Sequence, residues 1–320
     1  MNTFVNFLHA ALLAGTPLMF GTLGEIVTEK AGNLNLGVEG MMSIGAIAGF
    51  YVGFTTQNIV LAVLGAFLAG LLSALIYAFL TVTLKANQNV TGLTLTIFGV
   101  GFANFFGDFL RESAGIDVLK LSDKITNTVQ AIHIPVLSDI PYVGKLFFQY
   151  NPFVYFGILL CILMGIYILH TRKGLNLCAV GENPGAADAA GVNVRVVEQG
   201  GYLGVLGGGV CGIGGAYISL VLCGGIWVTD SVNGLGWIAV ALVIFASWNP
   251  FKAILGSFIF GAFNILKFYI PKNIVTIPEA IFDMLPFLVT AIVLIVTSIR
   301  KSKENTQPAG CGINYFREER

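Results

Sequence analysis

The chain has 320 residues, of which 56% are hydrophobic and only 11% are charged, whereas a soluble domain carries about 25% charged residues. This composition excludes a soluble globular protein, because so few charges cannot cover a water-facing surface, and it makes lipid the solvent for most of the chain. The 17 basic and 17 acidic residues cancel, which excludes nucleic-acid binding driven by bulk charge. The five cysteines and three histidines show no metal-ligand spacing, so no metal site is predicted.

Apolar segments of about 20 residues, the length needed to cross a bilayer, recur along the whole chain. They predict an all-α, polytopic transmembrane helix bundle of about nine spans (8–10). The first apolar run has no Lys or Arg before it, which favours a retained membrane helix over a signal peptide. The second and seventh spans are short for a straight crossing. The predicted spans are 4–23, 39–55, 59–84, 91–110, 152–170, 198–222, 235–248, 252–270 and 281–299.

Lys and Arg divide the connections between these spans into two sides. The odd-numbered connections and the C-terminal tail hold eleven of them, and the other side holds six. Because cytoplasmic loops carry the excess, we predict an external N-terminus and a cytoplasmic C-terminus in a multi-pass protein of the cell inner (cytoplasmic) membrane. Residues 1–300 form the transmembrane domain, with a long external loop at 111–151 and a cytoplasmic loop at 171–195. The polar tail, 301–320, is expected to be cytoplasmic and disordered.

Two segments far apart in the sequence resemble each other. AVLGAFLAG at 62–70 matches AILGSFIFG at 253–261 in pattern, and each follows a short span that opens with Leu-Gly. The predicted topology gives the two units opposite orientations, which indicates an inverted repeat. The interface of such repeats typically holds the substrate near the bilayer midplane. The alternative is chance similarity between helices rich in small residues.

The cytoplasmic loop at 171–195 contains signals for a short helix. Asn183 is a good N-cap, Pro184 suits the first helical position, and Gly191 is a stop. A helix of about two turns on the cytoplasmic face suits a contact that transmits force to a partner. An ordinary interfacial loop is the alternative.

Here the sequence resembles a known family. GxxxxAVGENPxAAxxAG at 174–191 resembles the coupling loop of ABC importer permeases of the branched-chain amino acid/simple sugar/nucleoside superfamily. GExxTEKAGNLNLGVEGMM at 24–42 is similar to the N-terminal signature of the nucleoside-type branch, and KANQ at 85–88 and MLP at 284–286 also resemble that branch. The matches cover nearly the whole chain.

The resemblance implies a permease domain that is not an enzyme. The chain contains no GxxxxGK[ST] motif and therefore no P-loop for a nucleotide phosphate. The resemblance implies that ATP binds to a separate ABC ATPase subunit and that this chain binds no cofactor. A second permease subunit, homologous or identical, would complete the pore, and an extracytoplasmic substrate-binding lipoprotein would deliver the solute. The coupling residues it implies are Gly174, Gly181, Glu182, Asn183, Pro184, Ala187 and Gly191.

The implied function is uptake of nucleosides or a related small polar solute through half of an ABC importer pore. Riboflavin and simple sugars are the alternative substrates. An ion-coupled secondary transporter is the alternative from another class, and it would use Glu39, Asp108 and Asp283 as ion ligands.

The first candidates for the substrate path lie in the Gly- and Asn-rich stretch at 32–40. A helix start there leaves backbone N–H groups free, and Asn35 and Glu39 stand among them. An acid at the membrane boundary is costly and commonly faces a polar cavity. The alternative for Glu39 is a structural role near a helix N-terminus, or paired with Lys30.

The other candidates are Asn104, Asp108 and Trp237. The first two lie one turn apart on the fourth span and could line the outer part of the pore, or they could form hydrogen bonds between packed helices. Trp237 opens the short seventh span, where its ring could stack on a nucleobase. Interfacial anchoring is the alternative for Trp237, and it also accounts for Trp227 and Trp248.

Overall fold

The computed structural model describes residues 2–133, 135, 137–192, 194, 201–270, 278–300 and 306–316. Within these residues all regular secondary structure is helical, and the only β-contact is an isolated bridge. Seven described helices are long and apolar enough to cross a membrane, and the shorter apolar helices Leu235–Phe245 and Ala280–Val296 correspond to the seventh and ninth predicted spans. The predicted all-α polytopic bundle is confirmed.

The helices are α1 (Asn2–Lys30), α2 (Val38–Thr56), α3 (Ile59–Ala78) with the π-helical turn η1 (Phe79–Thr83), α4 (Gln88–Ala114), α5 (Asp123–Thr128), α6 (Val143–Phe147), α7 (Pro152–His170), α8 (Arg172–Glu182), α9 (Pro184–Ala189), α11 (Gly201–Tyr217) with the π-helical turn η2 (Ile218–Leu222), α12 (Leu235–Phe245), α13 (Pro250–Tyr269) and α14 (Glu279–Arg300).

Asn-Pro pairs fix the starts of α7, α9 and α13. The side-chain oxygens of Asn151, Asn183 and Asn249 each accept a backbone N–H of the first turn, at 3.2, 2.9 and 2.9 Å respectively. Pro suits the next position because the N–H that it lacks has no partner within the helix. Local sequence therefore decides where these three helices begin.

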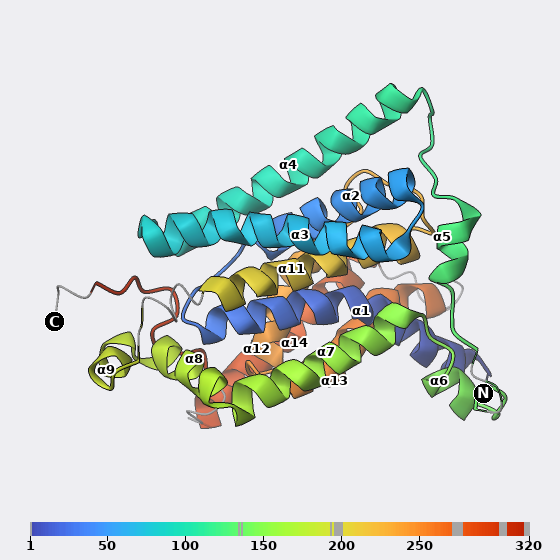
Figure 1. Ribbon diagram of the computed structural model, residues 1–320. Coiled ribbons are helices and arrows are strands. Elements are labelled where there is room, and N and C mark those ends of the chain that lie inside the picture. Colours follow the sequence, from blue (N-terminus) through green and yellow to red (C-terminus); the bar gives the residue numbers. More distant parts are fainter. Residues whose placement is uncertain are drawn as a thin grey trace.

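The two ends of the bundle carry different segments (Figure 1). α5 and α6 lie at the end that holds the N-terminus, where His9 Nε2 is 2.9 Å from the backbone oxygen of Gln149. α8, α9 and the last described residues of the chain lie at the opposite end. The predicted topology requires this separation of the loops at 111–151 and 171–195. The assignment of one end to the cytoplasm stays a prediction.

α2 begins inside the bundle. The segment 31–37 turns back along α1 after that helix ends, so that Asn35 N donates to Glu25 Oε1 at 3.0 Å. α2 then runs to the end that carries α5, where Ser122 bonds to the side chain of Gln57. We call 31–37 the re-entrant segment.

α12 also begins inside the bundle and runs the other way. The connection 223–234 starts at the end that carries α5, where Trp227 N donates to the Leu119 oxygen at 3.0 Å. α12 finishes near the opposite end, because the Trp248 indole that follows it donates to Glu29 at 2.5 Å. The N-termini of two oppositely directed helices therefore face each other within the bundle.

The helix pairings follow an inverted repeat. α1 packs against α13 and α12, just as α11 packs against α3 and α2, and α4 packs on α2 as α14 packs on α12. α1, the first helix of the first repeat (α1–α4), thus packs against the second repeat, and α11, the first helix of the second repeat (α11–α14), packs against the first. Such an exchange is what two units of opposite orientation produce when they share one interface.

The two similar sequence segments have the same packing role in this arrangement. Gly70 closes the first segment and lies against the backbone of Gly208 in α11, and Gly261 closes the second and lies against the backbone of Ala11 in α1. A Cβ at either glycine would overlap a backbone oxygen. Small residues permit this close approach of helices in membranes, so the repeat accounts for the similarity better than chance.

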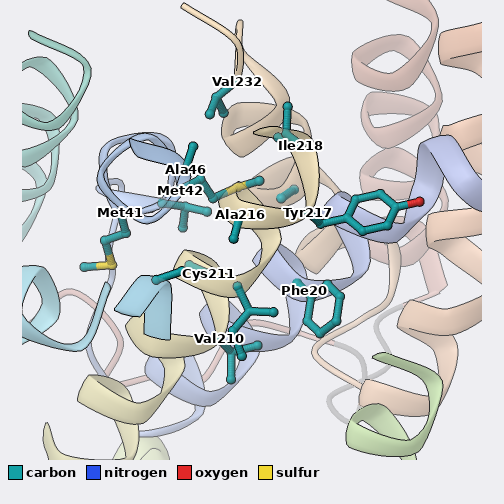
Figure 2. Close-up of a cluster of buried hydrophobic side chains, with 14 of the residues drawn as sticks. Phe20, Met41, Met42, Ala46, Val210, Cys211, Ala216, Tyr217, Ile218 and Val232 are labelled. Atoms are coloured by element: carbon teal, nitrogen blue, oxygen red, sulfur yellow. The ribbon is translucent and has the colours of Figure 1, made fainter. Parts of the chain in front are cut away.

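The core lies where α1, α2 and α11 meet (Figure 2). Phe20, Met41, Met42, Cys211 and Ala216 come together there, and each is at most 1% exposed. Apart from Phe20, these are small or unbranched side chains, and methionine adapts its shape to irregular gaps. The core therefore fixes the crossing of the three central helices.

The C-terminal tail departs from the sequence prediction. Gly310 N donates to the Gly181 oxygen at 2.9 Å, and Gly312 N donates to the Gly32 oxygen at 3.2 Å. Disorder is therefore the wrong expectation for 306–316, because backbone oxygens of α8 and of the segment after α1 accept hydrogen bonds from the tail. The rest of the tail beyond residue 300 lies outside the described residues.

Candidate coupling and translocation sites

The short helices α8 and α9 meet at Asn183 and form what we call the coupling elbow. Asn183 caps α9, and Gly191 follows the helix with φ +84°, a backbone conformation that suits glycine. The helix predicted from Asn183, Pro184 and Gly191 is confirmed as α9, Pro184–Ala189.

Sequence reasoning missed α8, which has 11 residues and precedes α9. The side-chain oxygen of Thr171 caps it by accepting from Gly174 N at 3.1 Å. Leu177 and Val180 are buried on one face of the helix. The available signal was a Thr N-cap at 171 followed by apolar residues three apart, Leu177 and Val180. The segment is short, so this signal is weak.

The elbow contacts the start of the re-entrant segment. A Cβ at Gly181 would overlap the carbonyl oxygen of Lys30 and lie 3.2 Å from Gly32 N. Gly32 itself has φ +93°. Two glycines thus let the end of α8 touch the backbone that leads from α1 into the bundle.

The predicted coupling residues divide into two groups in the structure. Gly174, Gly181 and Ala187 are buried, Pro184 is half-buried, and Glu182, Asn183 and Gly191 are exposed. The exposed group lies beside Ala186, Ala189 and Ala190, which are also exposed. The open face of α9 is therefore formed by small side chains, as a surface that enters a groove on a partner requires.

Hydrogen bonds fix the re-entrant segment along its length. Asn35 is 2% exposed, and its side-chain oxygen accepts from Gly37 N at 2.9 Å. Tyr77 donates to the Leu34 oxygen at 2.6 Å, and Leu34 N donates to Gln88 at 2.7 Å. Asn35 therefore shapes the turn before α2 and does not face an open path.

Glu39 joins the two oppositely directed helices. Its carboxylate accepts from Gly234 N at 2.7 Å and from Gly236 N at 2.6 Å, and the side chain is 4% exposed. The first turn of α12 has free N–H groups and carries positive partial charge, which a carboxylate stabilises. Of the two interpretations of Glu39, the geometry favours the structural one, with the α12 N-terminus as its partner in place of Lys30.

Asn104 and Asp108 are placed differently, although they lie one turn apart on α4. Asn104 Oδ1 accepts from Asp230 N at 3.0 Å and so holds the connection before α12. Asp108 is 3.4 Å from Arg111 on its own helix, and its side chain is 56% exposed. Asn104 therefore borders the meeting point of the half-helices, and Asp108 lies further toward the end that carries α5.

Sequence reasoning missed the polar connection before α12. Asp230 and Asn233 are exposed and have φ of 57° and 43°, which is uncommon for residues other than glycine. They lie between Asn104 and the start of α12, where Trp237 is half-buried. The run TDSVNG at 229–234, directly before a short apolar helix, was the available signal.

Interfacial anchoring is wrong for two of the three tryptophans. Trp227 is 5% exposed and packs against Phe50, with ring centroids 5.7 Å apart. Trp248 is 6% exposed and donates to Glu29. Gly107 leaves space for the ring of Trp227, and the buried Glu29 accepts the hydrogen bond of the Trp248 indole.

Membrane-crossing helices related by an inverted repeat, with two helices that start inside the bundle, define a multi-pass membrane transport protein. The model of the family "branched-chain amino acid transport system / permease component" matches residues 7–294. The chain belongs to this family and is an ABC transporter permease of the inner membrane.

Several relatives cover most of the chain. The nucleoside ABC transporter permease protein NupC of Lactococcus lactis is 33% identical over 100% of this chain and 99% of its own length. The guanosine ABC transporter permease protein NupQ of Bacillus subtilis is 31% identical over 89% of each chain. A putative glucose ABC transporter permease protein of Haloferax volcanii is 37% identical over 83% of this chain and 78% of its own. No solved structure matches the chain significantly.

Proposed function

We propose that this chain forms half of the translocation pore of an ABC importer that takes up nucleosides. The observation that carries the proposal is the contact between the coupling elbow and the re-entrant segment. Gly181 lies directly on the backbone of Lys30 and Gly32, so a displacement of the elbow reaches the segment that leads to the half-helices.

The proposed mechanism is alternating access driven by a partner. An ATPase subunit binds ATP and moves the exposed face of α9. The elbow passes the motion to the re-entrant segment, which ends at α2 and its first-turn residue Glu39. Because Glu39 holds the first turn of α12 through two hydrogen bonds, α2 and α12 change their relative position together. The pore then opens toward one side at a time, as rocking of inverted repeats produces.

Because this chain forms the pore and a partner binds ATP, the mechanism requires three partners. The ABC ATPase subunit docks on the elbow, and this chain binds no cofactor of its own. A second permease, identical or homologous, faces the connection before α12, where Asp230 and Asn233 are exposed. An extracytoplasmic substrate-binding lipoprotein delivers solute at the end that carries α5 and α6.

Nucleosides are the favoured substrates, because two relatives are named as nucleoside and guanosine permeases. Asp230, Asn233 and Asn104 offer hydrogen bonds for ribose hydroxyls or base edges beside the half-helices, and Trp237 offers a ring for stacking. A simple sugar is the second candidate, because another relative is named as a glucose permease. Riboflavin, a heterocycle with a polyol chain, is a third.

The ion-coupled alternative finds less support in the geometry. Both oxygens of Glu39 accept backbone N–H bonds. Asp108 is paired with Arg111 at 3.4 Å, and Asp283 is paired with Lys267 at 3.2 Å. The three acids lie on different helices and already have partners, so they do not form a common cation site.

Purification and uptake test the proposed function together. The chain, expressed with its neighbouring genes and solubilised in mild detergent, is expected to bring an ATPase subunit with it. Proteoliposomes of that complex, with the ATPase on the luminal side, should take up guanosine or uridine only when ATP is enclosed in the lumen. Uptake without ATP, driven by a sodium or proton gradient, would establish the ion-coupled alternative instead. Glucose in the same assay separates the sugar alternative.

A tryptophan on the open face of α9 should block coupling without unfolding the chain. Ala189→Trp adds bulk where the side chain is exposed, so the amount of chain in the membrane should stay unchanged while ATPase co-purification and uptake fall about tenfold. Ala131→Trp, also on an exposed alanine but at the other end of the bundle, is the control and should leave ATPase binding intact. Equal ATPase binding by both variants would remove α9 from the docking surface.

A further inference from the structure

The C-terminal residues 306–316 lie between the coupling elbow and the membrane bundle. They carry no charged side chain, contain no helix and follow the last membrane helix, α14. Yet they contact three segments that are distant in sequence: the elbow, the re-entrant segment and the connection between η1 and α4. We call 306–316 the strap.

The first set of contacts joins the strap to the elbow. Gly310 N donates to the Gly181 oxygen at 2.9 Å, and Ala309 N donates to Glu182 at 3.2 Å. The Tyr315 hydroxyl donates to Asp188 at 3.1 Å. The Tyr315 ring packs on an apolar cluster that includes residues of both α8 and α9. The strap therefore binds both helices of the elbow.

The second set of contacts joins the strap to the bundle. Gly312 N donates to the Gly32 oxygen at 3.2 Å. The side-chain amide of Asn314 donates to the Lys85 oxygen at 2.7 Å and accepts from Gln88 at 3.3 Å. Gln88 in turn accepts from Leu34 N at 2.7 Å. The strap thus reaches the re-entrant segment both directly and through Gln88.

The strap covers only one side of α9. It lies against Pro184 and Asp188, whereas Ala186, Ala189 and Ala190 remain exposed. The face that we assign to ATPase docking therefore stays open. This arrangement fits a connector between the elbow and the bundle, and it does not fit a plug that competes with the partner.

We propose that the strap is a positioning element for coupling, which ties the elbow to the re-entrant segment so that movement of one displaces the other. The proposal rests on the proposed function, because it takes the elbow as the docking site of an ATPase. Gly181 contacts Lys30 and Gly32 only through small surfaces, which transmit a push. The hydrogen bonds of the strap add resistance to a pull, so both strokes of the cycle reach the half-helices.

The test uses the assembled transporter in proteoliposomes and measures guanosine, uridine or glucose taken up per ATP hydrolysed. A chain that ends at residue 305 should still insert and bind the ATPase, but its uptake per ATP should fall about fivefold or more. The double variant Asn314→Ala with Tyr315→Phe removes the hydrogen bonds of these two side chains but keeps the packing of the ring at 315, and it should lose coupling in the same direction by a smaller factor. A chain that ends at residue 316 and the variant Ile313→Ala, at a side chain that is 67% exposed, are the controls and should match the wild type.

The outcomes separate the strap from the proposed function. If the wild-type chain recruits no ATPase, the proposed function itself fails. If the wild type is coupled and the chain that ends at 305 is equally coupled, the strap has no part in coupling. Faster uptake or hydrolysis in the shortened chain would make the segment an inhibitor and would also overturn the proposal. Counting only complexes with bound ATPase keeps a loss of assembly from imitating a loss of coupling.

Discussion

Replacing Glu39 with alanine is expected to abolish uptake and to destabilise the protein in detergent. The carboxylate satisfies Gly234 N and Gly236 N inside the bundle, and each buried donor left without an acceptor costs about 1–3 kcal/mol. Gly236 N is buried and Gly234 N is half-buried, so the loss of both bonds predicts a destabilisation of about 2–4 kcal/mol, read as a lower melting temperature of the purified chain. Uptake should fall further than the amount of folded protein, because α12 loses its link to α2.

Two further variants sharpen the test of Glu39. Glu39→Gln keeps one acceptor oxygen but turns an amide donor toward the second N–H, so its effect should lie between those of the wild type and Glu39→Ala. Glu112→Ala removes an exposed carboxylate from the C-terminal end of α4 and should leave the melting temperature unchanged. A melting temperature of Glu39→Ala equal to that of Glu112→Ala would show that the link between α2 and α12 does not stabilise the fold.

Valine at Gly99 should disrupt the bundle, whereas valine at Gly101 should not. A Cβ at Gly99 would lie 2.5 Å from both Cα and O of Gly40 in α2, whereas a Cβ at Gly101 would meet nothing within 4 Å. Backbone atoms cannot move aside as a flexible side chain does, so Gly99→Val should cost about 3 kcal/mol. The two sites lie two residues apart on the same helix, which keeps position along the helix and helix propensity nearly matched, while Gly99 is buried and Gly101 is exposed.

Thermal stability and uptake should separate this pair of variants. Gly99→Val should melt at a lower temperature and take up no substrate, because α4 can no longer pack against the first turn of α2. Gly101→Val should melt like the wild type. If residue 101 faces the second permease subunit, Gly101→Val should lower uptake of the substrate but leave the melting temperature unchanged. Similar melting of the two variants would contradict the close approach of α2 and α4.

Much of the fold could be predicted from local composition and pattern. Apolar length predicted the membrane helices, and the Asn183-Pro184 pair with Gly191 predicted α9, because a helix cap depends on residues within one turn of it. The similar segments at 62–70 and 253–261 predicted the inverted repeat, because equivalent packing requires small residues at equivalent positions.

The candidate site was less accessible to such reasoning. Their polarity near a membrane helix predicts a substrate path at Asn35 and Glu39, yet their partners are the turn before α2 and the N-terminus of α12. The helical spacing of Asn104 and Asp108 predicts a shared face, but only Asn104 binds the connection before α12. A hydrogen bond between segments more than one hundred residues apart leaves no periodic signal.

By itself, the sequence determined that the chain is a helical membrane protein, and it indicated the internal repeat and the position of α9. These properties depend on composition, on helical length and on neighbours a few residues away. Only the tertiary structure decided that Glu39 joins two half-helices, that Trp248 is buried against Glu29, and that residues 306–316 bind the elbow. Those outcomes depend on which backbone donors and acceptors meet once the helices have packed, and in lipid each such group must find a partner within the protein.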